Sequence, residues 1–152
     1  MDVNYINTIS VEDYNFLRQS VGWAKLEQQQ ACTGIARSAF FISAVVDNKV
    51  VGMTRVVSDG GYIAVIVDVI VLPDFQGNGI GKTMVQKAMD YIKNTISDGQ
   101  SVFVTVMAAK DRESFYSQFG FEARPTEKFG AGMTQFIYHP TNKQAVSEIN
   151  GA

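Results

Sequence analysis

The sequence predicts a mixed α/β fold, in which helices pack on a sheet that contains both antiparallel and parallel strand pairs. Residues 39–46 and 50–57 are β-branched and aromatic runs joined by the short polar turn 47–49, which is typical of a hairpin. Residues 62–72 are rich in Val and Ile, as expected of a central strand covered on both faces. One helix-like stretch separates this strand from the next, 101–107, and a right-handed crossover would make the two strands parallel.

The part of the chain before the hairpin contains one clear helix and one ambiguous stretch. Ser10 has the residue type of a helix N-cap, acidic residues follow it in the first turn, and the apolar residues Tyr14 and Leu17 recur at helical spacing. This helix is expected to end near Gly22. The polar stretch 25–36 lacks a persuasive apolar stripe, so it is compatible with either helix or loop.

The second half of the chain is expected to alternate between helices and strands. Residues 82–96 carry an apolar stripe at helical spacing and would form the crossover helix. Residues 112–119 predict a short helix, 121–123 the start of a strand and 133–138 a last strand. The chain has 152 residues, no internal repeat and no low-complexity linker, so residues 1–152 are expected to form a single domain.

A glycine-rich turn, Gln76-Gly77-Asn78-Gly79-Ile80-Gly81, follows the central strand and is the most informative motif in the chain. A strand that feeds a helix through such a turn presents free backbone N–H groups at the positive end of the helix, which suits a pyrophosphate. A Walker A loop would need a glycine at position 76, and a dinucleotide fingerprint would need another glycine spacing. A tight turn without a ligand would need only one of the glycines.

Two separated segments resemble a known family. The pattern Gln76-x-x-Gly79-x-Gly81 after a strand, and the segment Ser114-Phe115-Tyr116-Ser117-Gln118-Phe119-Gly120-Phe121 farther along, are similar to the acetyl-CoA-binding motif and the tyrosine helix of the GCN5-related N-acetyltransferase (GNAT) superfamily. The resemblance implies an α+β fold with a mixed, mostly antiparallel sheet of about six to seven strands and helices on both faces. It also implies that the parallel pair splays apart to admit the pantetheine arm.

The resemblance implies which residues contact acetyl-CoA. The backbone of Val69, Ile70 and Val71 would hold the acetylpantetheine, and one of these amides would polarise the thioester carbonyl. The turn would bind the pyrophosphate, chiefly through backbone amides, and two lysines could add charge, although ordinary solvated lysines would look the same. The expected contacts with the phosphates are Gln76, Gly77, Asn78, Gly79, Ile80, Gly81, Lys82 and Lys110.

Acetyl transfer to an amine needs a proton donor for the departing thiolate and an acceptor for the amine proton. Tyr116 matches the family tyrosine near the sulfur, and a phenol with an ordinary pKa of about 10 is protonated at neutral pH, so it would serve as general acid. The carboxylate or histidine bases of similar proteins align with Val65 and Val67, which are apolar. Asp68 is one residue along, and a bulge would be needed to re-aim it. A structural role for Asp68, with a water chain as the base, is the alternative.

The acceptor amine should enter beside the early helices and the late strands, although ordinary packing could explain each residue expected there. His139 and Cys32 are the only residues of their types and have no partners at metal-ligand spacing, so no metal is expected. The candidate wall residues are Trp23, Phe41, Arg55, Phe129 and Met133.

Composition restricts the partners. The formal net charge is −2 and no stretch concentrates Lys and Arg, so nucleic acid is not an expected partner. No apolar run approaches the roughly 20 residues of a membrane span, so no membrane is expected either. A start without signal-peptide features, together with one cysteine, predicts a cytoplasmic location. Members of the superfamily often pair through exposed sheet edges, so a homodimer is compatible with the resemblance.

The leading hypothesis is an acetyl-CoA-dependent N-acetyltransferase that transfers its acetyl group to a primary amine of a small molecule by direct attack in a ternary complex. Cys32 does not lie beside a base, so no covalent enzyme intermediate is expected. The alternatives are a non-catalytic CoA or acyl-CoA sensor, an acetyltransferase of protein or peptide amines, and a phosphate-loop nucleotide hydrolase. The sequence leaves open the identity of the amine, the general base and the range of acyl groups.

Overall fold

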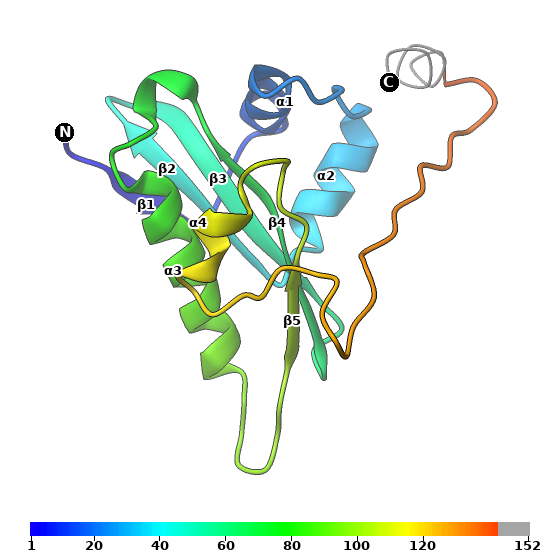
Figure 1. Ribbon diagram of the computed structural model, residues 1–152. Coiled ribbons are helices and arrows are strands. Elements are labelled where there is room, and N and C mark those ends of the chain that lie inside the picture. Colours follow the sequence, from blue (N-terminus) through cyan, green and yellow to red (C-terminus); the bar gives the residue numbers. More distant parts are fainter. Residues whose placement is uncertain (143–152) are drawn as a thin grey trace. The chain divides into compact units, whose positions relative to one another are not determined.

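The computed structural model describes residues 1–142 in two compact units, Met1–Asp111 and the part from Arg112 onward (Figure 1). The first unit holds one sheet in the spatial order β1-β2-β3-β4-β5. Neighbouring strands are antiparallel except for the parallel pair β4 and β5, which confirms the predicted mixed and mostly antiparallel sheet. Its strands are β1 (Asn4–Ile6), β2 (Phe40–Val46), β3 (Lys49–Ser58), β4 (Ile63–Val71) and β5 (Phe103–Val106).

Helices cover both faces of this sheet. Figure 1 shows α1 and α2 on one side and α3 on the other. On one face of β3, a Cβ at Gly52 would lie 3.1 Å from Cε of Met84, so α3 packs closely there. On the opposite face, the guanidinium of Arg55 donates to a carbonyl of α2. The helices of the first unit are α1 (Val11–Ser20), α2 (Gln28–Ala36), the 3-10 helix η1 (Pro73–Phe75) and α3 (Ile80–Asn94).

Local signals explain where the first two helices begin. The Ser10 hydroxyl accepts the backbone N–H of Asp13 at 3.0 Å, which confirms the predicted N-cap of α1. The Glu27 carboxylate caps α2 in the same way, so most of the ambiguous stretch 25–36 is helical. Ala31 is the buried residue of α2, and a helix that buries so little shows no apolar stripe in its sequence.

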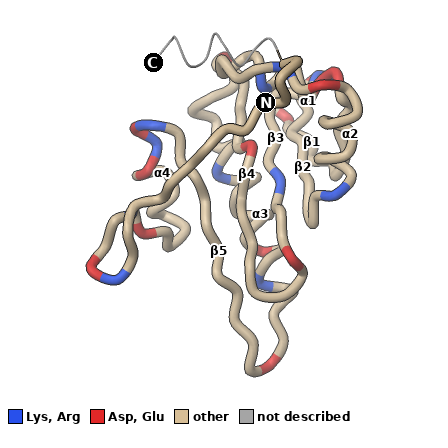
Figure 2. The backbone as a smooth tube through the Cα atoms, turned by 90° about the vertical axis from the view of Figure 1, so that its right-hand side faces the viewer, with Lys and Arg blue, Asp and Glu red and all other residues tan. Residues whose placement is uncertain are grey.

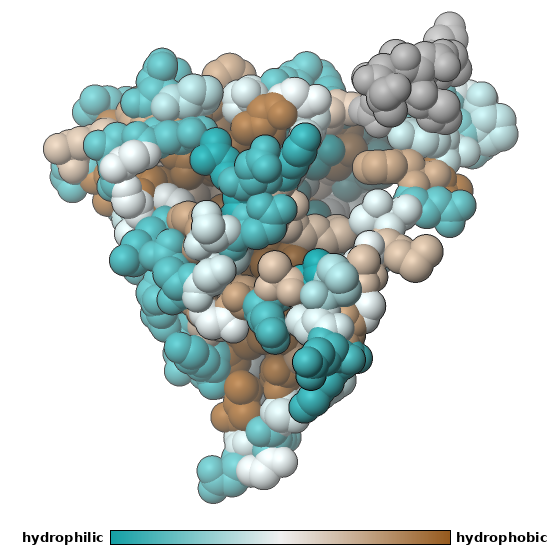
Figure 3. All heavy atoms as spheres, in the orientation of Figure 1, coloured by the Kyte–Doolittle hydropathy of each residue, from teal (hydrophilic) through white to brown (hydrophobic). Residues whose placement is uncertain are grey.

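The hairpin and the crossover helix also follow from local sequence. Asp47 and Asn48, between β2 and β3, have φ angles of 48° and 61°, the paired left-handed conformations of a type I′ turn. The predicted stripe of α3 is buried against β2, β3 and β4. Hydrophilic residues cover much of the opposite side of α3, at the left in Figure 3. The fully buried side chains of the first unit include Tyr14, Leu17, Met53, Ile70, Ile80, Met84 and Val85.

The predictions of six to seven strands and of two C-terminal strands were wrong for the described residues. Five strands are present, and residues 121–123 and 133–138 form none. The β-rich residues Met133, Phe136 and Ile137 are 96%, 76% and 87% exposed, so their apolar side chains have no sheet face to pack on. Strand propensity produces a strand only where a neighbouring strand accepts its backbone hydrogen bonds.

The opposite error occurred at the N-terminus. The strand Asn4–Ile6 was not expected, because three residues are too few for an alternating pattern. It forms because Tyr5 pairs with Ala44 on the edge of the hairpin. The strand predicted at 101–107 is also shorter, Phe103–Val106, since only these residues pair with β4.

The described part of the second unit contains the short helix α4 (Glu113–Ser117), which confirms the helix predicted at 112–119. Within α4 the rings of Phe115 and Tyr116 meet edge to face, with centroids 5.0 Å apart. Among residues 1–142, no helix combines the length and the apolar character of a membrane span. A single domain over residues 1–152 stays a prediction.

Candidate active site

The parallel strand β5 pairs with only the first part of β4. The ladder runs from Ile63 and Phe103 to Ile66 and Val106, where β5 ends. Strand β4 continues to Val71, with β3 on one edge and, among the described residues, no strand on the other. Pairing therefore ends within the parallel pair that the resemblance expects to splay apart. Apart from the Val67 and Val71 carbonyls, which accept the Thr54 hydroxyl and the Gln76 side-chain amide, this edge of β4 is open to an extended ligand among the described residues.

A β-bulge interrupts β4 within the same segment. Met53 pairs with Ile70 and Arg55 with Val67, so Asp68 and Val69 both lie opposite a single residue of β3. Asp68 has a φ of 53°, in the left-handed region that aspartate tolerates better than most residues. A bulge bends its strand and re-aims a side chain, which is the alternative that the sequence left open for Asp68.

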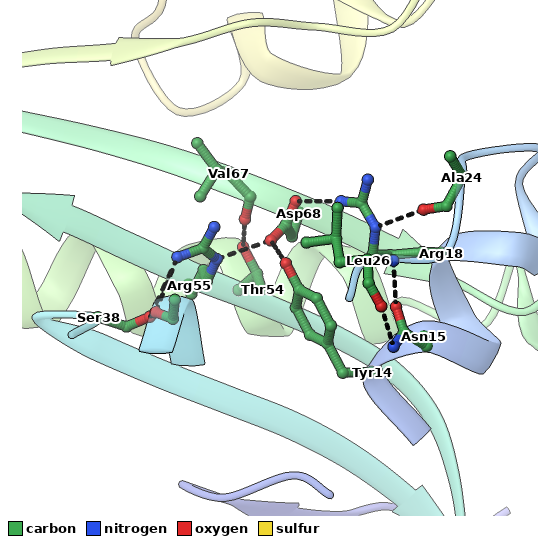
Figure 4. Close-up of polar contacts among 11 residues, drawn as sticks. Tyr14, Asn15, Arg18, Ala24, Leu26, Ser38, Thr54, Arg55, Val67 and Asp68 are labelled. Carbon is green, nitrogen blue, oxygen red and sulfur yellow. Dashed lines mark hydrogen bonds and ion pairs between the residues drawn. The ribbon is translucent and has the colours of Figure 1, made fainter. Parts of the chain in front are cut away.

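The bulge brings Asp68 into a network of polar side chains, which Figure 4 shows. The Tyr14 hydroxyl donates to Oδ2 of Asp68 at 2.7 Å, and Nε of Arg55 donates to the same oxygen at 2.6 Å. A terminal nitrogen of Arg18, Nη1, lies 3.8 Å from Oδ1. Burial, followed by the Asp68 charge, raises the pKa of Tyr14 above its ordinary value, so this phenol stays protonated at neutral pH and serves as a donor.

This geometry bears on the choice of Asp68 as the general base. Its Oδ2 already accepts two hydrogen bonds, and Oδ1 faces Arg18. An amine proton could therefore reach only Oδ1, where it would lie beside the positive Arg18 guanidinium. The arrangement therefore favours a positioning role for Asp68, and its role as the base stays a prediction.

We expect Asp68→Asn to lower the free energy of unfolding by about 2 kcal/mol, because it removes the negative charge beside two partly buried guanidinium groups. Asparagine keeps the size of the side chain and tolerates the positive φ of this position. Urea denaturation would measure the loss. Asp98→Asn, at an exposed site with the same change of charge, is the matched control and should change stability by less than about 0.5 kcal/mol. Equal losses of unfolding free energy in both variants would show that the Asp68 network does not contribute to stability.

The glycine-rich turn is held by its own side chains. Nε2 of Gln76 donates to the carbonyl of Val71 at 2.9 Å, and Nδ2 of Asn78 donates to the carbonyls of Phe75 and Gln76. Gly77 and Gly79 have φ angles of 78° and 77°, which residues with a Cβ rarely adopt. Helix α3 begins directly after Gly79, so Ile80 and the following glycine belong to its first turn rather than to the loop.

The first turn of α3 leaves backbone N–H groups free. The Thr83 amide is bonded to the carbonyl of Gly79 at 2.9 Å, whereas within residues 1–142 no partner is found for the amides of Ile80, Gly81 and Lys82. This first turn contains no acidic side chain, and the side chain of Lys82 is exposed beside it. The amides, the positive end of the helix dipole and the lysine together fit a pyrophosphate group.

The tyrosine expected as the general acid lies in the second unit. Tyr116 is 7% exposed, and its ring meets those of Phe115 and Phe121 edge to face. Burial raises the pKa of Tyr116 above its ordinary value of 10.0, so the phenol is protonated at neutral pH. It therefore has the protonation state that a proton donor requires.

The residues predicted to line the acceptor pocket fall in different surroundings. Arg55 belongs to the Asp68 network, and Trp23 lies beside it, with its ring 5.3 Å from the Arg18 guanidinium. Phe41 is 7% exposed and packs in the core. Phe129 and Met133 are exposed in the second unit, and Lys110 is exposed beyond the end of β5.

Sequence reasoning missed Tyr14 and Arg18. They are four residues apart on α1 and so share one helix face, which the structure turns toward the sheet. An arginine on the apolar face of an amphipathic helix was the signal that could have drawn attention to both.

The comparisons with known proteins agree with this architecture. The model of the acetyltransferase (GNAT) family matches residues 4–121. The uncharacterised N-acetyltransferase ycf52 of Pyropia yezoensis is 31% identical over 121 residues, which are 77% of this chain and 67% of that protein. Histone acetyltransferase TAP1 of Glycine max is 26% identical over 77% of this chain and 54% of its own length.

Solved structures show the same fold. A protein of unknown function from meticillin-resistant Staphylococcus aureus is 31% identical, with a TM-score of 0.79 over 90% of this chain and 100% of its own. A GNAT-family acetyltransferase from Streptococcus pneumoniae is 25% identical, with a TM-score of 0.72 over 91% of this chain and 98% of its own. The splayed parallel pair, the bulge and the glycine-rich turn therefore occur in a chain that belongs to the GNAT family of acetyltransferases.

Proposed function

We propose that this protein is an acetyl-CoA-dependent N-acetyltransferase, which transfers an acetyl group to a primary amine of a small molecule by direct attack in a ternary complex. Membership of the GNAT family supports acetyl transfer in general. The observation that carries the proposal is the set of amides at the start of α3 without a partner among residues 1–142, next to the part of β4 beyond Ile66, where no described strand pairs with its outer edge. An extended chain that ends in a pyrophosphate fits these two features together.

The thioester supplies the activated acetyl group, and the first unit supplies its binding surface. The amides of Ile80, Gly81 and Lys82 bind the two phosphates. The outer edge of β4, at Val69 and the two residues after it, forms backbone hydrogen bonds with the amides of the pantetheine arm. The bulge ends regular pairing where the thioester would lie, so a backbone N–H is available to stabilise negative charge on its carbonyl oxygen.

Tyr116 is proposed as the proton donor to the departing sulfur. Its phenol is protonated at neutral pH because burial raises its pKa. A positioned donor of this kind contributes roughly 10²–10⁴-fold to a reaction rate. Tyr116 is therefore expected to affect kcat rather than the affinity for acetyl-CoA.

The proton of the attacking amine needs an acceptor. Since two donors already occupy Oδ2 of Asp68, we propose an ordered water as the acceptor. The variant Asp68→Asn distinguishes the alternatives: loss of a base would lower kcat by about 100-fold or more and remove a limb of its pH profile. Loss of a positioning group would change KM for the amine and leave the shape of that profile unchanged.

Ligand-induced stabilisation gives a direct test of the cofactor. At a concentration of 100 Kd, acetyl-CoA is expected to stabilise the folded protein by ~2.7 kcal/mol, because it binds only the folded state. Thermal unfolding with acetyl-CoA, CoA and ATP at equal concentrations would measure the shift in Tm. A shift with ATP alone would support the nucleotide hydrolase instead. A shift with acetyl-CoA but no acetylated product from a broad panel of amines would support the sensor.

The name of one relative gives the acceptor a second candidate. TAP1 of Glycine max is a histone acetyltransferase by name, which favours a protein amine. A panel that includes lysine-rich peptides would compare the two classes of acceptor directly. A cytoplasmic location and a homodimer stay predictions.

A further inference from the structure

Two arginines and one aspartate meet on the sheet face that α1 and α2 cover. Arg18 comes from α1, Arg55 from β3 and Asp68 from the bulge in β4, all within the first unit. Two guanidinium groups against one carboxylate leave a formal charge of +1, and Tyr14 is a neutral donor. Figure 2 shows Lys and Arg scattered among Asp and Glu along the chain, so this excess is a local arrangement in a protein of net charge −2.

Both guanidinium groups are held in place by other contacts. Nε of Arg18 donates to the carbonyl of Ala24 at 3.1 Å, and its guanidinium carbon lies over the rings of Tyr14 and Trp23. Nη1 of Arg55 donates to the carbonyl of Gly34 at 3.1 Å. An arginine fixed in this way loses little conformational freedom when a further partner binds.

Each arginine keeps donors that the described residues do not use. Nη2 of Arg18 and Nη2 of Arg55 have no hydrogen-bond partner among residues 1–142. These side chains are 16% and 18% exposed, and no fully buried side-chain nitrogen or oxygen in the described part lacks a partner. The free donors therefore reach solvent. Guanidinium donors that are accessible and unpaired can bind a carboxylate or a phosphate.

The position of the cluster links it to the acceptor. Asp68 is the residue before Val69, where the segment that would hold the acetylpantetheine begins, and consecutive Cα atoms are about 3.8 Å apart. The cluster therefore adjoins the start of the segment proposed to hold the acetylpantetheine. A polycation such as a polyamine or a lysine-rich peptide would meet a net positive charge at the same place.

We propose that Arg18 and Arg55 form an anion-binding subsite, and that the acceptor is a small amine that also carries a carboxylate or phosphate. Asp68 is a positioning residue that holds both guanidinium groups through its carboxylate. The proposal rests on the proposed acetyltransferase function for the role of the subsite, whereas anion binding itself does not depend on turnover.

The first experiment measures the subsite without catalysis. The side-chain Nε–H signals of arginine are followed by NMR while inorganic phosphate is added at constant ionic strength, with chloride as the balancing ion. Saturable shifts are expected for Arg18 and Arg55 but not for the exposed Arg37. Arg18→Gln should weaken phosphate binding at Arg55 by about tenfold, the loss of one charge-assisted contact. Shifts that do not saturate, or that are equal at Arg37, would overturn the subsite.

The second experiment measures substrate choice with matched amines. β-Alanine is compared with propylamine, and phosphoethanolamine with ethanolamine, with spermidine as the polycation. We expect kcat/KM to be at least about tenfold higher for the anionic member of a pair. Arg55→Gln should remove this preference through KM, Arg55→Lys should restore part of it, and Arg37→Gln, with the same change of charge, should leave it intact.

The two experiments separate the two proposals. Saturable phosphate binding without acetylation of any amine would retain the subsite and count against the acetyltransferase function. Acetylation of neutral amines or spermidine in preference to the anionic ones, unchanged by Arg55→Gln, would retain the function and overturn the subsite.

Discussion

Gly79→Val is expected to weaken acetyl-CoA binding by about 100-fold, or ~2.7 kcal/mol. Gly79 has a φ of 77°, a conformation in which a β-branched residue is strained, although the space around it is open. The turn must therefore change shape to accept valine, and the amides of Ile80, Gly81 and Lys82 follow directly after it. Isothermal titration with acetyl-CoA would measure the dissociation constant.

A matched control separates this effect from general backbone strain. Gly60, in the turn between β3 and β4, has a φ of 76° and equally open surroundings. Gly60→Val should destabilise the fold to a similar extent and leave the affinity for acetyl-CoA unchanged. Gly79→Asn should fall between the wild type and Gly79→Val, since asparagine tolerates left-handed backbone. Undiminished affinity in Gly79→Val would remove the turn from the cofactor site.

Tyr116→Phe is expected to lower kcat by about 100-fold, because the phenylalanine ring cannot donate a proton to the departing sulfur. The affinity for acetyl-CoA should change less than about twofold, since the ring and its packing against Phe115 and Phe121 are kept. Single-turnover and steady-state kinetics, together with a direct binding measurement, would show this split.

The pH dependence provides an internal check. Burial raises the pKa of Tyr116 above 10.0, so the phenol loses its proton only above pH 10. Deprotonation of Tyr116 should therefore not lower kcat of the wild type at any pH below 10. Tyr62→Phe, at an exposed tyrosine of the first unit, should leave kcat unchanged. An unaltered kcat in Tyr116→Phe would exclude Tyr116 as the general acid.

Much of the first unit was predictable because its signals are local. The cap at Ser10, the type I′ turn at Asp47 and Asn48, and the buried stripe of α3 depend on residues close together in sequence. The glycine-rich turn was found for the same reason, since Gly77 and Gly79 adopt the positive φ angles that glycine permits. Short-range rules describe such features well.

Features that depend on distant partners were predicted poorly. Residues 133–138 have the composition of a strand but no strand beside them, whereas Asn4–Ile6 has almost no pattern and pairs with β2. In the Asp68 network, Asp68 is 54 positions from Tyr14 and 13 positions from Arg55. Neither contact could therefore be predicted from residues adjacent in sequence.

The sequence by itself determined the first helix, the hairpin, the central strand and the crossover helix of the first unit, the family, and the turn that fits the cofactor phosphates, because each depends on contiguous residues. Only the tertiary structure decided that β4 is bulged at Asp68 and that two arginines converge there. The physical reason is that register and side-chain direction in a sheet are set by the neighbouring strand and the helices packed on it. Those partners lie far away along the chain.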